Sequence, residues 1–250
     1  MKLQTIIHKL EEFAPLFLKE DWDNVGLMVG HPDWDITKCY VALDITDRVI
    51  DCAVQNGCNL IVSHHPFIMG GLSSINLETE KGSQIARLIS HKIAVYSMHT
   101  NFDSCQGGVN DMLCELLGLL DYHVDEPVIC RKGRLKEPMC LRDFITLAKD
   151  VLKVPYVNYT GDPNRTVSTV AVIGGSGGSL ISQVKDCDVF LTGEAKYHEY
   201  QLAESLGLCM VTAGHFETEN PALKKIRALL EDLSLEVVNY EVYRGFYQTV

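Results

Sequence analysis

The chain has 250 residues, of which 46% are hydrophobic, and its 33 acidic and 22 basic side chains give a formal net charge of −11. This length and apolar content are enough for a packed core without disulfides, which excludes an intrinsically disordered or fibrous protein. The acidic charge, with no basic run longer than Lys224-Lys225, disfavours bulk electrostatic binding to nucleic acids or anionic membranes. A small-molecule or protein partner is expected instead.

Apolar runs bounded by turn residues alternate with helical patterns along most of the chain. In chain order the patterns predict helix 4–13, strand 40–43, helix 47–55, strand 59–62, helix 82–90, strand 93–98, helix 109–117, helix 141–152, strands 170–173 and 189–191, helix 200–205, strand 208–212 and helix 222–230. The strands are rich in Val, Ile and Leu with little alternation, which is typical of strands buried on both faces. The order predicts an α/β fold with mostly parallel sheets.

Turn residues mark several element ends and one larger division. Thr46 is the predicted N-cap of the helix that begins at residue 47, and Gly57 and Gly118 follow two predicted helix ends. Residues 121–138 hold charged side chains and two prolines without a sustained period, which predicts a crossing between two lobes. The lobes are expected at 1–126 and 127–250, with strands between 186 and 212 packing back beside the first half.

Compartment is inferred from the absence of targeting signals and from the cysteines. No apolar run approaches the roughly 20 residues that a membrane-spanning helix needs, and residues 1–12 lack the apolar core of a signal peptide. The nine cysteines include no C-x-x-C pair, which disfavours a disulfide framework and a thiolate zinc site. We therefore expect a cytoplasmic protein with reduced thiols.

Three predicted strands are followed directly by histidines and carboxylates. These segments are Leu60 to Pro66, Val95 to Asp103 and Met210 to Glu219. Ligands of open α/β sheets gather at the carboxyl ends of parallel strands, so we expect the three ends to converge on one cleft. Pro221 suits the first position of a helix, which makes Asn220 the expected N-cap and leaves His215 to Glu219 in a loop.

The side chains at these ends are metal-ligand types. Three imidazoles from these ends, together with Asp103 and Glu219, supply nitrogen and oxygen ligands but no thiol, a set that suits zinc, iron, manganese or cobalt. Five such groups exceed what one catalytic ion usually takes from protein, so they predict a two-metal site with ions about 3.5–4 Å apart.

The alternative for any single histidine is an ordinary structural role. We assign that role to four isolated histidines, His8, His31, His91 and His123. The adjacent pair His64-His65 is different, because two polar rings on opposite sides of a strand end cannot both fill a core.

Three weaker signals leave two interpretations each. The glycine-rich stretch 174–179 could cradle a phosphate on its backbone N–H groups or form a tight strand-to-helix turn. Glu194 could line the cleft or begin a solvated helix. Trp22, which stands among acidic residues, could floor a base-binding pocket or close the edge of the core.

Together these segments resemble the GTP cyclohydrolase 1 type 2 homolog family, also called the Nif-three-like or dinuclear-metal-binding proteins. The likeness runs from Trp22 to Glu219 and beyond, with the motifs in the family's order. They are Asp23-Asn24-Val25-Gly26-Leu27, Ser63-His64-His65-Pro66, His99-Thr100-Asn101-Phe102-Asp103, Gly174-Gly175-Ser176-Gly177, Leu191-Thr192-Gly193-Glu194 and His215 to Glu219.

The resemblance implies a Nif-three-like fold of two similar α/β lobes that face each other across a dinuclear metal cleft, assembled into a toroidal homohexamer. It implies that His65 and Asp103 bind one divalent ion, that His64 and His215 bind the other, and that Glu219 bridges both. Some relatives insert a further domain between the lobes, and this chain is too short to contain one.

The first functional hypothesis is a metal-dependent hydrolase that acts on GTP or another nucleotide. Two divalent ions, zinc, iron or manganese, would hold a bridging water and lower its pKa. With GTP, attack at C8 and ring opening would release formate, and His99 is the candidate general acid and base. Its alternative roles are support of the ligands or a further ligand contact. The other hypotheses are a metal-handling protein that stores or passes on ions, and a metal-dependent phosphoesterase, which would release orthophosphate.

Overall fold

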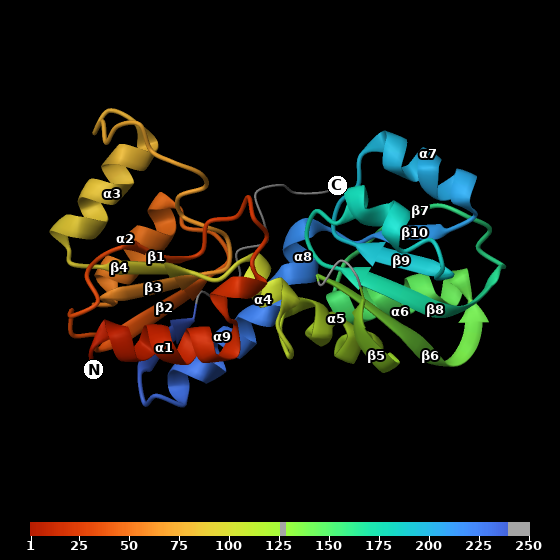
Figure 1. The fold of residues 1–250 in the computed structure, drawn as a ribbon, viewed down its shortest axis with the longest axis horizontal. Helices are drawn as coiled ribbons and strands as arrows, with labels where there is room; N and C mark the ends of the chain where they lie inside the picture. Colours follow the sequence, from red (N-terminus) through yellow and green to blue (C-terminus); the bar gives the residue numbers. More distant parts are fainter. Residues whose placement is uncertain (126–128, 240–250) are drawn as a thin grey trace. The chain divides into compact units, whose positions relative to one another are not determined.

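The computed structural model describes residues 1–125 and 129–239, and these form two α/β units, each with its own sheet (Figure 1). Unit 1 comprises Met1–Cys105 and the segment that begins at Ala222, and unit 2 comprises Gln106–Pro221. The α/β class is confirmed. The division differs from the expected one, because residue 127 falls inside the stretch of chain that forms unit 2 and lies outside the described residues.

Unit 1 is built on a five-stranded sheet in the order β1-β4-β3-β2-β11. Its strands are β1 (Gly26–Val29), β2 (Lys38–Ala42), β3 (Leu60–Ser63), β4 (Ala94–Ser97) and β11 (Glu236–Asn239). The pairs β4–β3, β3–β2 and β2–β11 are parallel, and only β1 runs antiparallel to its neighbour β4. The predicted parallel sheet is therefore confirmed for this unit.

Helices cover both faces of this sheet (Figure 1). They are α1 (Leu3–Phe13), the 3₁₀ turn η1 (Leu16–Leu18), α2 (Asp47–Gln55), α3 (Glu80–Ser90), α4 (Thr100–Ser104) and α9 (Leu223–Glu231). On one face, α2 and α3 bury Val49, Ile50 and Leu88 against strand residues such as Tyr40 and Val95. Helices α1 and α9 pack together on the other face. The predicted Thr46 cap is confirmed, since its side chain accepts a hydrogen bond from the Val49 N–H at 3.3 Å.

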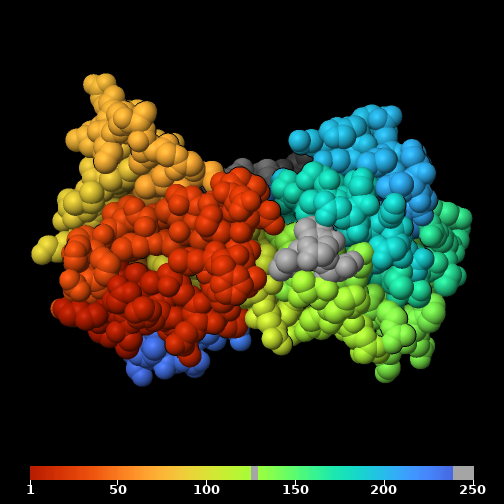
Figure 2. Space-filling view, in the orientation of Figure 1, coloured from red at the N-terminus to blue at the C-terminus, as the bar shows by residue number. Residues whose placement is uncertain are grey.

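The segment before α3 is an exposed apolar surface of unit 1. Met69, Leu72, Ile75 and Leu77 are all exposed, and Figure 2 shows this part of the chain, in gold, standing out from the unit.

Unit 2 is built on a six-stranded mixed sheet in the order β5-β6-β8-β9-β10-β7. Its strands are β5 (Leu120–Asp125), β6 (Cys130–Cys140), β7 (Asn158–Tyr159), β8 (Thr166–Ile173), β9 (Val189–Thr192) and β10 (Cys209–Thr212). Strands β8, β9 and β10 are parallel, whereas the β5–β6, β6–β8 and β10–β7 pairs are antiparallel. The prediction of a mostly parallel sheet is wrong for this unit.

Helices also cover both faces of the second sheet (Figure 1). They are α5 (Val109–Leu117), α6 (Leu141–Leu152), the 3₁₀ turn η2 (Gly178–Gln183), α7 (Tyr197–Leu206), α8 (His215–Glu219) and the 3₁₀ turn η3 (Asn220–Ala222). One face buries Ile181 of η2 and Ala203 of α7 against Phe190 and Met210 of the sheet. Helices α5 and α6 lie on the opposite face.

Two predictions about the middle of the chain are wrong. Residues 121–138 hold β5 and most of β6 rather than a crossing. Their charged side chains suggested a loop, but Arg131 and Lys132 are buried and form ion pairs with Asp111 and Asp186. The strands between 186 and 212 stay in the sheet of unit 2, and β11 is the strand that joins unit 1.

The described chain contains no helix long and apolar enough to cross a membrane. Seven of the nine cysteines are buried, as expected for thiols that pack as small hydrophobes. Burial raises the pKa of Cys39 to about 12 and that of Cys58 to about 11. Both side chains are therefore neutral thiols at physiological pH.

Candidate metal centre

In unit 1 the candidate ligands follow the carboxyl ends of neighbouring parallel strands. His64 and His65 come directly after β3, and His99 follows β4 by two residues. Because Ser63 at the end of β3 pairs with Ser97 at the end of β4, the two segments leave the sheet side by side. The imidazole rings of His64 and His65 lie 5.3 Å and 5.7 Å from that of His99. The predicted meeting of these two strand ends is confirmed.

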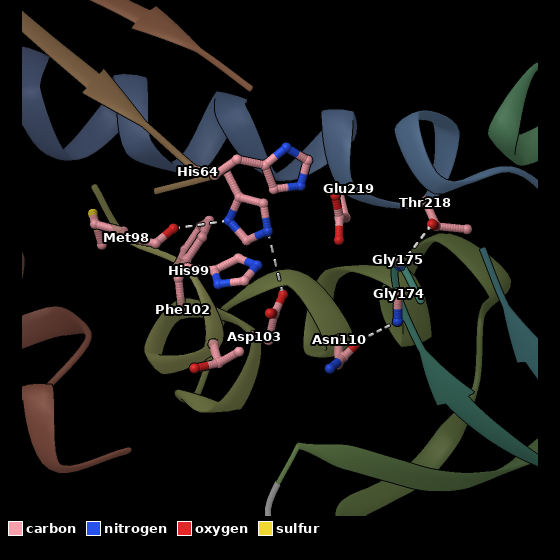
Figure 3. Close-up of polar contacts among 12 residues, drawn as sticks. His64, Met98, His99, Phe102, Asp103, Asn110, Gly174, Gly175, Thr218 and Glu219 are labelled. Atoms are coloured by element: carbon pink, nitrogen blue, oxygen red, sulfur yellow. Dashed lines mark hydrogen bonds and ion pairs between the residues drawn. The ribbon is translucent and has the colours of Figure 1, made fainter. Parts of the chain in front are cut away.

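Each of the two adjacent histidines has its Nδ1 atom anchored by a nearby acceptor. His64 Nδ1 lies 2.8 Å from the Met98 carbonyl oxygen (Figure 3), and His65 Nδ1 lies 2.7 Å from Oδ1 of Asp44, just after β2. A carbonyl or carboxylate oxygen can only accept, so Nδ1 carries a proton, and in the neutral ring Nε2 keeps its lone pair. This is the arrangement that metal-binding histidines usually have.

His99 is anchored in the same way, by a buried carboxylate. Its Nδ1 lies 2.8 Å from Asp23 Oδ1, and Asp23 is 6% exposed. Burial would by itself raise the pKa of Asp23, but hydrogen bonds from His99 and Thr100 outweigh it and lower this pKa to about 2. Asp23 is therefore ionised at neutral pH and can only accept a hydrogen bond from the Nδ1–H group of His99.

Asp103 joins this group from α4, the short helix that begins directly after His99. Its N–H donates to the His99 carbonyl at 3.0 Å, which places the two residues one helical turn apart. Asp103 Oδ1 lies 3.7 Å from Nε2 of His64, a side chain that is 1% exposed (Figure 3). One nitrogen from each of His64, His65 and His99 lies within 4.8 Å of the others. Converging imidazole nitrogens beside a carboxylate fit a first-row divalent ion.

Unit 2 repeats this plan with one histidine and two carboxylates. His215 begins α8, three residues after β10 ends, and its Nε2 lies 3.1 Å from Oε2 of Glu219 one turn later. Glu194, two residues after β9, places Oε2 3.2 Å from His215 Nδ1. Nδ1 therefore faces an acceptor here too, and Nε2 and the buried Glu219 carboxylate form a second pair of adjacent donor atoms.

The expected loop from His215 to Glu219 is helix α8, so that prediction is wrong. Thr218 N–H donates to the Gly214 carbonyl at 3.1 Å, and Pro221 lies in the following 3₁₀ turn rather than in the first turn of α9. A five-residue helix is too short to give a periodic signal. Its helical turn is what places His215 and Glu219 on the same face.

The glycine-rich stretch after β8 supports Glu219 rather than cradling a phosphate. The Gly174 and Gly175 N–H groups donate to Asn110 Oδ1 and Thr218 Oγ1 at 2.7 Å and 3.0 Å (Figure 3), and Gly177 donates to Thr192 Oγ1 at 3.0 Å. These donors are used inside unit 2, which favours the tight-turn interpretation. Gly175 has a φ of +59°, and an added Cβ would lie 2.0 Å from Glu219 Oε1. A side chain at this position would therefore displace the carboxylate that the glycine backbone passes.

The sequence identified the imidazole and carboxylate donors, but it did not identify their anchors Asp44 and Asp23. Asp44 follows a predicted strand as His64 does, so the same strand-end signal could have found it. Glu194 lines this group and does not begin a helix, since α7 starts at Tyr197. Trp22 is 63% exposed and lies edge-on to His99, so it does not close the core. The expected convergence of the third strand end with the first two stays a prediction.

Comparison with known proteins places these features in a family. A Clostridium perfringens protein named GTP cyclohydrolase 1 type 2 homolog is 40% identical over 235 residues, which cover 90% of each chain. A Helicobacter pylori protein named GTP cyclohydrolase 1 type 2 is 31% identical over 219 residues, covering 87% of this chain and 86% of that protein.

Among solved structures, a hypothetical protein of Staphylococcus aureus superposes with a TM-score of 0.90 at 27% identity, covering 100% of this chain and 99% of that one. The match to a protein family spans residues 1–245. The chain therefore belongs to the Duf34/NIF3 (NGG1p interacting factor 3) family.

Proposed function

We propose that this protein is a divalent-metal-dependent hydrolase that acts on a nucleotide. The observation that carries the proposal is that four imidazoles at strand ends, those of His64, His65, His99 and His215, each have Nδ1 facing an acceptor. A set of rings held in this way has its Nε2 atoms ready to bind ions or move protons. Histidines that merely fill a surface have no need of such matched anchoring.

The proposed ligands are divided between the two units. His65 and Asp103 would hold one ion, His64 and His215 the other, and Glu219 would bridge both. Two observations support a site built from both units: His64 lies beside Asp103 and His215 beside Glu219, and neither unit alone supplies all five ligands. The division of the ligands between the two ions follows the family resemblance. The ions, when bound, would supply Lewis acidity and lower the pKa of water towards neutrality.

His99 is the proposed general acid and base. With its proton on Nδ1 held by Asp23, the ring offers Nε2 to accept a proton from a nucleophile and to return it to a leaving group. The ring lies against both His64 and His65, so this nitrogen is close to the place where the ligands gather. Its edge-on neighbour Trp22 is exposed and could contact a planar base.

GTP is the substrate we propose first, because relatives with similar chains carry the name GTP cyclohydrolase 1 type 2 or its homolog. In this reaction one water would add to C8 of the purine and open the ring, and a second water would hydrolyse the resulting formamide to formate and a free amine. The test is formate release from GTP by protein loaded separately with zinc, iron and manganese. We expect formate that depends on the metal.

The matched variants for this test are His215→Ala and His198→Ala, which remove an imidazole at a ligand position and at an exposed position of the same unit. Formate release should be lost in the first and kept in the second. Orthophosphate without formate would replace this proposal with a phosphoesterase. Neither product, from protein that holds two ions per chain, would contradict the hydrolase and favour metal handling.

The family resemblance also leads us to propose a homohexamer. Light scattering should then give a mass six times that of the 27.9 kDa chain, and a monomer or dimer at micromolar concentration would contradict it.

A further inference from the structure

The carboxylate of Asp23 accepts hydrogen bonds from four donors. Its Oδ1 atom accepts from His99 Nδ1 and from the Asn24 N–H, both at 2.8 Å. Its Oδ2 atom accepts from the Thr100 N–H at 3.1 Å and from the Thr100 hydroxyl. The side chain has no exposed surface. The four lone-pair positions of the carboxylate are therefore occupied, and two of the four donors are backbone N–H groups, which fix its position.

The direction of the Thr100 hydroxyl bond is also fixed. The Glu20 N–H donates to Thr100 Oγ1 at 2.9 Å, so the hydroxyl accepts on that side and its own proton is directed to Asp23. The Thr100 side therefore presents two donors to Oδ2. Asp23 can neither rotate nor present a proton to His99 without leaving a buried donor unpaired, which is costly.

We propose that Asp23 is a positioning residue that holds His99 as the tautomer protonated on Nδ1, so that Nε2 keeps its lone pair for proton transfer. The consequence for proton transfer rests on the proposed function of His99, whereas the tautomer itself depends only on contacts within unit 1. A ring flip would place a carbon opposite the carboxylate and lose the charge-assisted bond. The neighbouring rings of Trp22 and His64 also confine His99 from other directions.

Comparison with the Asp44–His65 pair shows why Asp23 fixes the tautomer of His99 more firmly. The Asp44 side chain that faces His65 is 31% exposed, so water competes for its oxygens. The Asp23 side chain is 0% exposed and its other acceptor positions are filled. Of these two histidines, His99 is thus the one whose tautomer is set by a rigid, water-excluded carboxylate.

The experiment is ¹⁵N NMR of the histidine rings in metal-free, full-length protein, with His99 assigned by a His99→Gln variant. At about pH 8.5, where a neutral imidazole is the ordinary form, the wild-type ring should show Nδ1 protonated and Nε2 unprotonated. A wild-type His99 protonated on Nε2 would overturn the inference whether or not any variant folds.

The variant Asp23→Asn replaces one acceptor oxygen by an amide NH₂, which must face either Thr100 or His99. We expect the Nε2-protonated form of His99 to increase, and kcat for the proposed reaction to fall about 10- to 100-fold with bound metal unchanged. Asp21→Asn, at an exposed neighbour, should change neither. An unchanged His99 signal in folded Asp23→Asn protein would overturn the inference. A changed signal in a protein that hydrolyses no nucleotide would instead contradict only the proposed function.

Discussion

Gly175→Ala separates stability from metal binding more cleanly than a ligand mutation would. Gly175 has a φ of +59°, and a left-handed backbone costs a non-glycine residue about 1–2 kcal/mol. The new Cβ would also lie 2.0 Å from Glu219 Oε1 and 3.2 Å from His215 Nε2. Oε1 is the end of a flexible side chain, so it can move away at little further cost in folding, but the carboxylate then leaves the position next to His215.

The expected result is therefore a loss of about 1–2 kcal/mol in unfolding free energy together with a fall of about 10- to 100-fold in metal affinity, the range seen when support of a ligand is removed. Gly207→Ala is the matched control. Gly207 lies in the same unit with a φ of +67°, and a Cβ added there would have no atom of the described residues within 4 Å. This variant should lose similar stability and keep full affinity.

The assays are urea unfolding of the metal-free proteins and competition of each metal-loaded protein with a chelator. If Gly175→Ala binds ions as tightly as wild type, Glu219 is not held as a ligand and the reasoning is refuted. Equal loss of affinity in Gly207→Ala would refute it as well, because the effect would then come from backbone strain alone.

Three other contacts each lead to a prediction. Asp44→Ala removes the acceptor at 2.7 Å from His65 Nδ1, so metal affinity measured by chelator competition should fall about 10- to 100-fold; unchanged affinity would show that His65 needs no anchor. Arg131→Met leaves Asp111 buried without its guanidinium partner, so urea unfolding should show that the unfolding free energy falls by about 3–5 kcal/mol. A fall of less than about 1 kcal/mol would contradict the stabilising role of this ion pair. The pKa of Asp23 is lowered from 3.8 to about 2. Its ionised form therefore contributes about 2 kcal/mol of stability that is present above about pH 4 and is lost as the pH falls towards 2. Acid unfolding of the metal-free protein should show this difference between wild type and Asp23→Asn above about pH 4, and parallel curves at all pH values would argue against it.

Most of the fold could be predicted from the sequence because the core elements carry strong local patterns. The parallel strands β2, β3, β4, β9 and β10 are continuous apolar runs, and α2 and α6 show clear helical periodicity. The missed elements are short or lie at sheet edges, as β1, β7 and β11 do.

Strand β6 was missed for a different reason, since it is long but strongly charged. Arg131 and Lys132 are buried only because Asp111 and Asp186, 20 and 54 residues away, compensate their charges. No local sequence pattern predicts such an ion pair. The anchor of His99 has the same origin, because Asp23 lies 76 residues from His99. Candidate donor atoms, and the anchor Asp44, could thus be predicted from strand ends, whereas the role of Asp23 required the tertiary structure.

The measurement that tests the account most directly is the number of divalent ions bound per chain, determined by elemental analysis after reconstitution. We predict two ions for wild type and for His198→Ala, and fewer for His65→Ala, His215→Ala and Glu219→Ala, with Glu219→Ala affecting both ions. Wild-type protein that binds no ion, or ligand variants that bind as many ions as wild type, would contradict the proposal that these side chains form a dinuclear centre.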